Sequence, residues 1–171
     1  MHKIAQFLLG RIIIGCCVAA VAPAQILPAL SNSDWEEYRV PEFGTRVEYP
    51  AAIFSVSEGK SEVGVGERLS TADRRASLTI YSRINQTGET PASYLRKNLR
   101  MSQSVIQYER VTTSFFAISA ARQGVIYYSR CNFSERGRSI HCFDLVYPQR
   151  EKRAWDDIVT RISLSLRPLQ G

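Results

Sequence analysis

Four consecutive runs of strand-forming residues occupy most of the chain between residues 105 and 148, and they constrain the fold more than any other feature. The runs are VIQYERV, SFFAISAA, GVIYYSRCNF and IHCFDLVYP. β-Branched and aromatic residues dominate them, and short polar or glycine-containing stretches separate them, which is typical of β-strands. The last two runs meet at a turn near Arg136 and Gly137, so they predict a hairpin within an antiparallel sheet.

The two cysteines of this hairpin predict a disulfide. Cys131 and Cys142 are placed symmetrically about the midpoint of Arg136 and Gly137. If residues 135–138 form the loop, the two cysteines face each other in a non-hydrogen-bonded pair. Their Cα atoms then approach to ~4.5 Å, a separation that a disulfide accepts. A bridge that closes so short a loop is worth roughly 3 kcal/mol.

A metal site or a redox pair fits the same cysteines less well. Zinc needs three or four converging ligands, and His141 is the only histidine outside the N-terminal segment. Alternation along the strand sends His141 to the face opposite Cys142. The cysteines also lack the Cys-x-x-Cys spacing of redox pairs. We therefore expect no metal and no cofactor.

The preceding part of the chain adds further strands. ERLSTA and RASLTIYSRI predict a second hairpin with its turn at Asp73 and Arg74. WEEYRVPEFGTRVEYP predicts two short extended runs around a turn at 41–44, and SEGKSEVGVG (57–66) reads as a polar loop.

Two amphipathic helices complete the predicted elements. Thr90 and Pro91 form an N-terminal cap signal, and residues 91–102 place apolar side chains on one broad arc. Near the end, REKRAWDDIVTRISLSL predicts a helix that lies on the sheet. Its apolar stripe consists of Trp155, Ile158, Val159, Ile162 and Leu166. The fold class is α+β: one antiparallel sheet of about six to eight strands, covered by helices.

The N-terminus has the three-part layout of an export signal. MHKIAQFLLGRIIIGCCVAAVAPAQ begins with a basic residue, continues with apolar residues and ends in small residues at Ala22 and Ala24. We expect a signal peptide over 1–24 cleaved after Ala24, a polar leader over 25–34, and a single domain over 35–169. The apolar run 12–24 is too short to span a bilayer, so the mature chain should contain no transmembrane span.

Two alternatives to cleavage remain open. The segment could stay as an uncleaved anchor. Ile13-Ile14-Gly15-Cys16 resembles a bacterial lipobox, in which Cys16 would be lipidated, although apolar sequence continues past that cysteine. Cleavage leaves one pair of cysteines in an exported domain, where oxidising conditions favour a disulfide. The expected location is periplasmic or secreted.

Catalytic patterns are weak in this sequence. Serine hydrolase chemistry needs a base, and His141 would have to serve, although Asp144 lies on the other face of its strand. The chain contains no Gly-x-Ser-x-Gly motif. We therefore expect no catalytic residues.

Basic residues offer a possible binding surface. The formal charge is +6, and it is scattered along the chain rather than concentrated in blocks. Arg96, Lys97 and Arg100 share one face of the first helix, while Arg136 and Arg138 lie at the hairpin turn. Together they could contact an anionic lipid, a glycan or an acidic protein. Nucleic acid is not an expected partner, because the aromatic and basic residues are not interleaved.

The order of the segments resembles a known kind of domain. The resemblance is carried by WEEY, FGTRVEYPAAIF, LSTADRRASLTIY, FFAIS, GVIYYSRC, IHCFDLVYP and WDDIVTRISLSLRP, from Trp35 to Pro168. In this order they resemble an uncharacterised secreted domain of alphaproteobacteria, itself similar to PsbP-like α/β sandwiches. The resemblance implies a sheet covered by helices and carries no catalytic residues across. PsbP-like relatives are mostly accessory or assembly subunits, which is an analogy of fold.

Three hypotheses about function follow. The preferred one is an exported, non-catalytic binding or accessory protein that recognises an envelope protein or an anionic envelope component. The second is a hydrolase-type enzyme whose site is assembled from dispersed Ser, Tyr, Asp and Arg side chains. The third is an envelope-surface module that binds anionic lipid or glycan through the basic helix face.

Overall fold

The computed structural model describes residues 27, 30–99, 102–134 and 137–168. The expected signal peptide, its cleavage site after Ala24 and the alternative lipidation site at Cys16 lie outside the described residues. Within the described ranges, no helix is long and apolar enough to cross a membrane.

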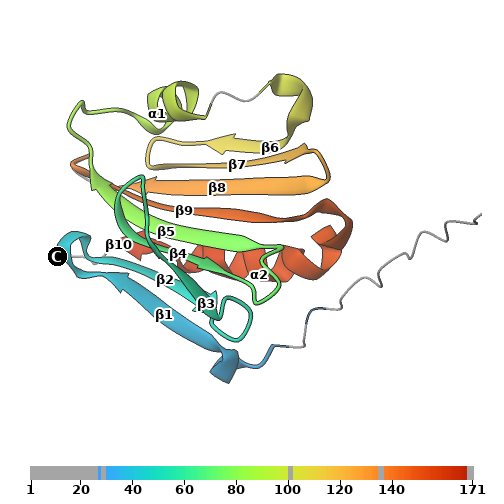
Figure 1. Ribbon diagram of the computed structural model, residues 1–171. Coiled ribbons are helices and arrows are strands. Elements are labelled where there is room, and N and C mark those ends of the chain that lie inside the picture. The colour runs from blue at the N-terminus through green and yellow to red at the C-terminus, as the bar shows by residue number, and fades with distance from the viewer. Residues whose placement is uncertain (1–26, 28–29, 100–101, 135–136, 169–171) are drawn as a thin grey trace, which may run out of the picture.

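Antiparallel strands form two sheets of different size (Figure 1). The large sheet has seven strands in the order β3-β4-β5-β9-β8-β7-β6, and the small sheet has three in the order β1-β2-β10. The strands of the large sheet are β3 (Val56–Lys60), β4 (Val65–Ser70), β5 (Ser77–Ile84), β9 (Ser139–Pro148), β8 (Val125–Phe133), β7 (Phe115–Arg122) and β6 (Ile106–Val111). Those of the small sheet are β1 (Trp35–Val40), β2 (Thr45–Pro50) and β10 (Arg167–Pro168).

Two α-helices lie against the sheets, α1 (Pro91–Asn98) and α2 (Lys152–Ser165). Four short 3₁₀ helices of the described chain accompany them: η1 (Asn32–Asp34), η2 (Pro41–Phe43), η3 (Gln103–Val105) and η4 (Gln149–Glu151). The α+β class with a mainly antiparallel sheet and two helices is therefore confirmed. The cover of the sheet is only partly helical, because the small sheet shares one face of the large sheet with α2.

The larger core lies between the large sheet, α2 and the small sheet. The predicted stripe of α2 is buried along its whole length, from Trp155 to Leu166. It meets Leu78, Phe143 and other inward side chains of the large sheet, together with Val47 of β2. Leu27 and Leu30, from the stretch expected to be a polar leader, also pack against this core.

The smaller core lies on the opposite face of the large sheet, under α1. Thr90 caps the helix, because its Oγ1 accepts a hydrogen bond from the backbone N–H of Ser93 at 3.2 Å. Tyr94 and Leu95 project onto Phe116 and the other buried residues of this cluster. The expected helix over 91–102 ends earlier, at Asn98, since the following residue leaves the helical region of backbone angles.

The segment 57–66, expected to be a polar loop, instead contains β3 and the start of β4. Its side chains show no apolar alternation because β3 is an edge strand whose residues are almost all exposed, so backbone pairing alone defines it. The glycines allow close packing on the neighbouring strand. A Cβ at Gly66 would lie 2.0 Å from the carbonyl oxygen of Ile80.

Candidate functional site

A cleft of about 520 Å³ lies between α2 and strands β6, β7 and β8. It exists because small side chains form its floor. Ala117 of β7 pairs with Arg110 on one side and Arg130 on the other, so a small residue separates two long ones on the same face. The wall on the α2 side includes Thr160 and Ser163.

Arg130 is the best-positioned charged group of this cleft. Its guanidinium carbon lies 4.4 Å from the centre of the Phe115 ring. Its Nε donates to Oδ1 of Asn132 and its Nη1 donates to Oγ of Ser163, both at 3.0 Å. Partial burial lowers the pKa of this guanidinium from its usual value. These contacts hold the side chain in one orientation.

Arg130 and Arg110 together leave positive charge in the cleft without an internal counter-ion. Arg110 lies 5.5 Å from the same Phe115 ring. Neither arginine forms an ion pair with a carboxylate in the part of the chain that the structure describes. Asp156, the one acidic residue among the described residues that line the cleft, pairs with Lys152 at 2.7 Å. The cleft therefore suits an anionic group supplied by another molecule.

Aromatic side chains form the rest of the wall and are themselves fixed. Tyr128 stacks on Phe143 at 5.6 Å between ring centres, and its hydroxyl is hydrogen-bonded to Oγ of Ser163 at 3.0 Å. Tyr147 stacks on Trp155 at 5.2 Å. Burial raises the pKa of Tyr128 and raises that of Tyr147 to about 12, so both phenols stay neutral near pH 7.

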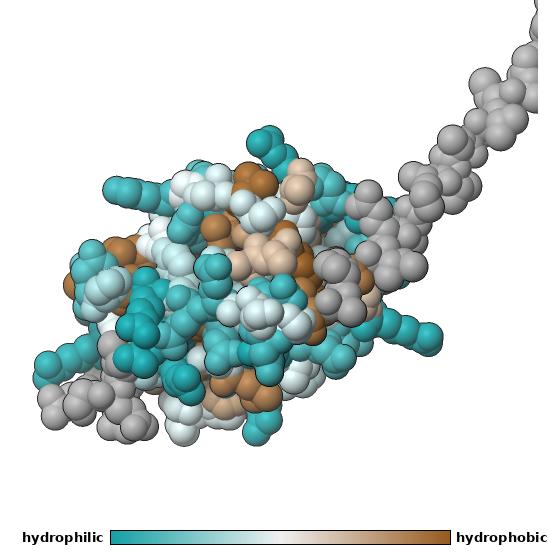
Figure 2. Space-filling view, turned by 90° about the horizontal axis from the view of Figure 1, so that it is seen from below, coloured by the Kyte–Doolittle hydropathy of each residue, from teal (hydrophilic) through white to brown (hydrophobic). Residues whose placement is uncertain are grey.

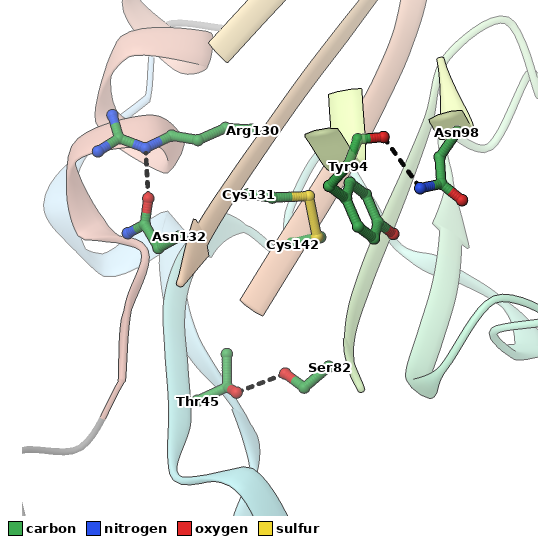
Figure 3. Close-up of a disulfide and its surroundings, with 8 residues drawn as sticks. All are labelled: Thr45, Ser82, Tyr94, Asn98, Arg130, Cys131, Asn132 and Cys142. Atoms are coloured by element: carbon green, nitrogen blue, oxygen red, sulfur yellow. Dashed lines mark hydrogen bonds between the residues drawn. A yellow bond between two sulfur atoms is a disulfide. The ribbon is translucent and has the colours of Figure 1, made fainter. Parts of the chain in front are cut away.

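The disulfide lies on the other side of the sheet from this cleft (Figure 3). Cys131 and Cys142 are directly paired across β8 and β9, with their Cα atoms 4.1 Å apart, and both are fully buried beside Tyr94. Figure 3 shows Arg130 and Cys131, neighbours in β8, projecting to opposite sides. The symmetry of the hairpin thus predicted the right pair.

The structure does not bring the two cysteines and His141 together as metal ligands. Among the described residues, no group of three or more His, Cys, Asp or Glu side chains is placed to hold a metal ion. His141 lies on the face opposite Cys142, as strand alternation requires.

Strand position alone would make His141 an ordinary edge residue near the hairpin tip, and this interpretation is wrong. His141 lies on the central strand β9 with 0% of its surface exposed. Its Nδ1 is 2.6 Å from Oγ1 of Thr45, and its Nε2 is 3.0 Å from Oγ of Ser139. Burial lowers the pKa of His141 to about 4. The small sheet, which packs over this end of β9, was not foreseen and explains the difference.

A second buried polar group lies near the disulfide on the α1 side. Ser129 of β8 is paired directly with Asp144 of β9. Ser129 and Tyr81 donate hydrogen bonds to the Asp144 carboxylate, yet burial dominates and raises the pKa of Asp144. Tyr81 is buried as well, which raises its own pKa. Ser129, Tyr81 and Asp144 thus satisfy one another's hydrogen bonds, and none of them lines the cleft on the α2 side.

The predicted basic surface is only partly described. Arg96 and Lys97 are exposed on α1, where Lys97 pairs with Glu89 at 3.0 Å. Arg138 is exposed near the hairpin turn. Arg100 and Arg136 lie outside the described residues. None of the three described residues lines the cleft on the α2 side.

Sequence reasoning missed the cleft. Arg110 and Arg130 each lie in a different strand-forming run, and nothing in the local sequence distinguishes either of them from a surface charge. The available signal was the contrast between small residues at alternate positions of SFFAISAA and large ones in VIQYERV and VIYYSRCN.

No protein-family model matches the sequence, and no curated protein matches it. Among solved structures, the fold is similar to the solution structure of cyanobacterial PsbP (CyanoP) from Synechocystis sp. PCC 6803. The TM-score is 0.56, and the alignment covers 86% of this chain and 99% of that chain at 10% sequence identity. At this identity the likeness concerns the fold alone: the chain has a PsbP-like α+β fold.

Proposed function

We propose that this protein is an exported, non-catalytic binding or accessory protein of the cell envelope, and that it engages its partner through the cleft between α2 and β6–β8. The observation that carries the proposal is Arg130. It is half-buried, fixed by Phe115 and two hydrogen bonds, and has no carboxylate partner among the described residues. A fixed cation in an aromatic cleft recognises an anionic group at little cost in side-chain entropy.

Export is supported by the N-terminal sequence and by the disulfide. The first residues have the layout of a cleavable signal, and disulfides persist mainly in oxidising compartments. The PsbP-like fold is compatible with an accessory role, as an analogy of fold.

Binding fits the cleft better than hydrolysis does. The residues that line it include no histidine and no cysteine. Ser163 is engaged by Tyr128 and Arg130, neither of which can serve as a base near pH 7. A broad hydrolase screen of the purified protein should therefore detect no turnover. Turnover that is lost with a single substitution in the cleft would support the enzyme hypothesis instead.

The basic face of α1 is a weaker candidate than the cleft. Lys97 already pairs with Glu89, which leaves Arg96 on α1 and Arg138 at the hairpin turn as the described cations of the predicted basic surface without an ion pair. Exposed charges of this kind are screened by salt and are usually solvated.

Site-specific photo-crosslinking in the cells that make the protein tests the binding proposal. A photoreactive phenylalanine would replace Tyr108, which lines the cleft and is 46% exposed, or Tyr127 as a matched control. Tyr127 is 38% exposed and belongs to the opposite face of the sheet. We expect a discrete crosslinked product from Tyr108 alone.

Two substitutions make this experiment specific. Arg130→Gln should reduce the crosslinked product at least tenfold. Arg122→Gln removes the same charge from an exposed position at the end of β7 and should leave the product unchanged. Equal crosslinking from both tyrosines, or no response to Arg130→Gln, would contradict the proposed site.

Intact mass spectrometry of the protein from its own cells tests export. A chain that starts at Gln25 and is two hydrogens lighter than the reduced form would support cleavage after Ala24 and the disulfide. A lipidated Cys16 would place the domain on a membrane. A full-length chain with free thiols would contradict export.

A further inference from the structure

Three arginines lie in a row across the small sheet, two from neighbouring strands and the third from the far end of the sequence. Arg39 of β1 pairs directly with Arg46 of β2, and Arg46 pairs directly with Arg167 of β10. Directly paired residues of antiparallel strands project to the same face. Neighbouring strands lie about 5 Å apart, so three guanidinium groups share one short strip of surface.

The row lies on the outer face of the small sheet. The alternate residues Thr45 and Val47 of β2 are fully buried toward the large sheet, which places Arg46 on the other side. Arg39 has 60% of its side chain exposed, and Arg167 is exposed. Figure 2, seen from the β1 side of Figure 1, shows hydrophilic residues interspersed with several smaller hydrophobic patches.

The acidic residues nearest in the sheet are already engaged. Glu37 receives a hydrogen bond from Nε of Arg39 at 2.6 Å. Glu48 pairs with Arg161 of α2 at 3.0 Å, and Arg161 also stacks on Trp35. Neither Arg46 nor Arg167 forms an ion pair with any carboxylate of the described residues.

Arg46 carries a second, independent sign of an absent partner. Its Nε is buried and has no hydrogen-bond acceptor, and it is the only such buried side-chain atom found among the described residues. A buried donor without an acceptor is unfavourable, and so are like charges directly opposite each other in a sheet. An anion between these side chains would relieve both.

We propose that the row of Arg39, Arg46 and Arg167 binds a phosphate-type oxyanion. One carboxylate has two oxygens and matches a single guanidinium fork, whereas a tetrahedral oxyanion has enough acceptor oxygens for several forks at once. The site is separate from the cleft of the proposed function and does not depend on it. Its ligand is either free phosphate or the phosphate of a lipid headgroup.

Nuclear magnetic resonance of the ¹⁵N-labelled protein tests the site with inorganic phosphate, at constant ionic strength kept with chloride. We expect a saturable shift of the Arg46 Nε–H signal together with backbone amides of β1 and β2. We also expect phosphate to raise the melting temperature of the wild-type protein, because a ligand that binds only the folded state stabilises it.

Arg46→Gln is the direct test of the site, and two variants of exposed residues replace it if this protein fails to fold. Arg167→Gln and Arg39→Gln should each raise the Kd for phosphate at least tenfold and abolish the rise in melting temperature. Arg122→Gln, with the same loss of charge at an exposed position of β7, should change the Kd less than twofold.

Flotation with vesicles distinguishes the two sources of phosphate. Binding to phosphatidylglycerol–phosphatidylcholine vesicles, but not to phosphatidylcholine alone, with displacement by inorganic phosphate, would assign the site to a lipid headgroup. Binding of inorganic phosphate without binding to either vesicle would assign it to free phosphate. No saturable shift and no selective vesicle binding would overturn the proposal, as would equal effects of Arg167→Gln and Arg122→Gln.

Discussion

The two faces of the large sheet are covered by very different amounts of structure. On one face, α2 contributes 14 residues and packs beside the small sheet over a core that includes Trp155, Phe143 and Val47. On the other face, α1 contributes only eight residues, of which Pro91, Tyr94 and Leu95 are buried. The disulfide lies in this second, smaller core.

The difference indicates two ways of stabilising a sheet face. Extensive burial of apolar surface suffices under α2, since each large side chain contributes a few kcal/mol. A short helix buries too little to match this, so a crosslink between adjacent strands compensates by restricting the unfolded chain. Substitutions in each core test whether apolar burial dominates under α2 and the disulfide under α1.

The largest effect is expected from Trp155→Ala. Trp155 is 1% exposed and packs against Phe54 and Tyr147, so its removal leaves a cavity in the larger core. We expect a loss of about 3–5 kcal/mol of unfolding free energy, measured by urea denaturation. Leu164→Ala on the same helix is the control, because Leu164 is 76% exposed and should change stability by less than ~0.5 kcal/mol. A loss below ~1 kcal/mol for Trp155→Ala would refute the dominant role of this core.

The next largest effect concerns pH and the contact between the two sheets. The pKa of His141 is about 4 in the folded protein against 6.5 for the unfolded group. The folded state thus resists protonation of His141. The contribution of neutral His141 to the free energy of unfolding is therefore fully present above pH 6.5 and is lost as the pH falls toward 4. We expect about 3 kcal/mol to be lost over this window.

Comparison with His141→Gln isolates this contribution. Asp144 acts in the opposite direction, because its raised pKa means that acid favours the folded state, but it is present in both proteins. Asp73 has a pKa of about 2, so it contributes only below this window. Parallel stability curves for wild type and His141→Gln between pH 6.5 and 4 would rule out the titration of His141.

Removal of the disulfide should be felt mainly in the smaller core. The double variant Cys131→Ala and Cys142→Ala should have a free energy of unfolding about 3 kcal/mol lower than that of the wild type. The reason is that the unfolded chain regains the conformational entropy that the bridge removes by closing the loop. Hydrogen exchange should accelerate more in α1 than in α2. Equal acceleration in both helices would mean that the two cores unfold as one unit and that the bridge stabilises both.

The smallest effect is expected at the cap of α1. Thr90→Ala removes the hydroxyl that accepts from the N–H of Ser93, which should lower stability by about 1 kcal/mol. Thr113→Ala, an exposed threonine in the turn between β6 and β7, is the matched control and should lie within ~0.5 kcal/mol of wild type. A Thr90→Ala variant as stable as this control would show that α1 is held by its packing alone.

Local patterns predicted the elements that depend on neighbours in sequence. The four strands from β6 to β9, the stripe from Trp155 to Leu166 and the pairing of Cys131 with Cys142 all follow from periodicity and symmetry. The edge strand β3 was not predicted, because its exposed side chains show no apolar alternation, although its partner β4 is the next strand in the sequence. The two-residue β10 was not predicted, because pairing with the distant strand β2 defines it. The cleft and the burial of His141 depend on where α2 and the small sheet cross the large one, which no local pattern records.

The position of β2 also has a consequence for the order of folding. β1 precedes it directly, but its other partners come from the far end of the chain: β10 pairs with it, and Ser165 of α2 bonds to the backbone of Glu48 across 117 positions. Contacts of such high sequence separation form late, because a long loop must close first. A chain delivered N-terminus first, from a ribosome or a translocation channel, therefore keeps this sheet incomplete until α2 and β10 emerge.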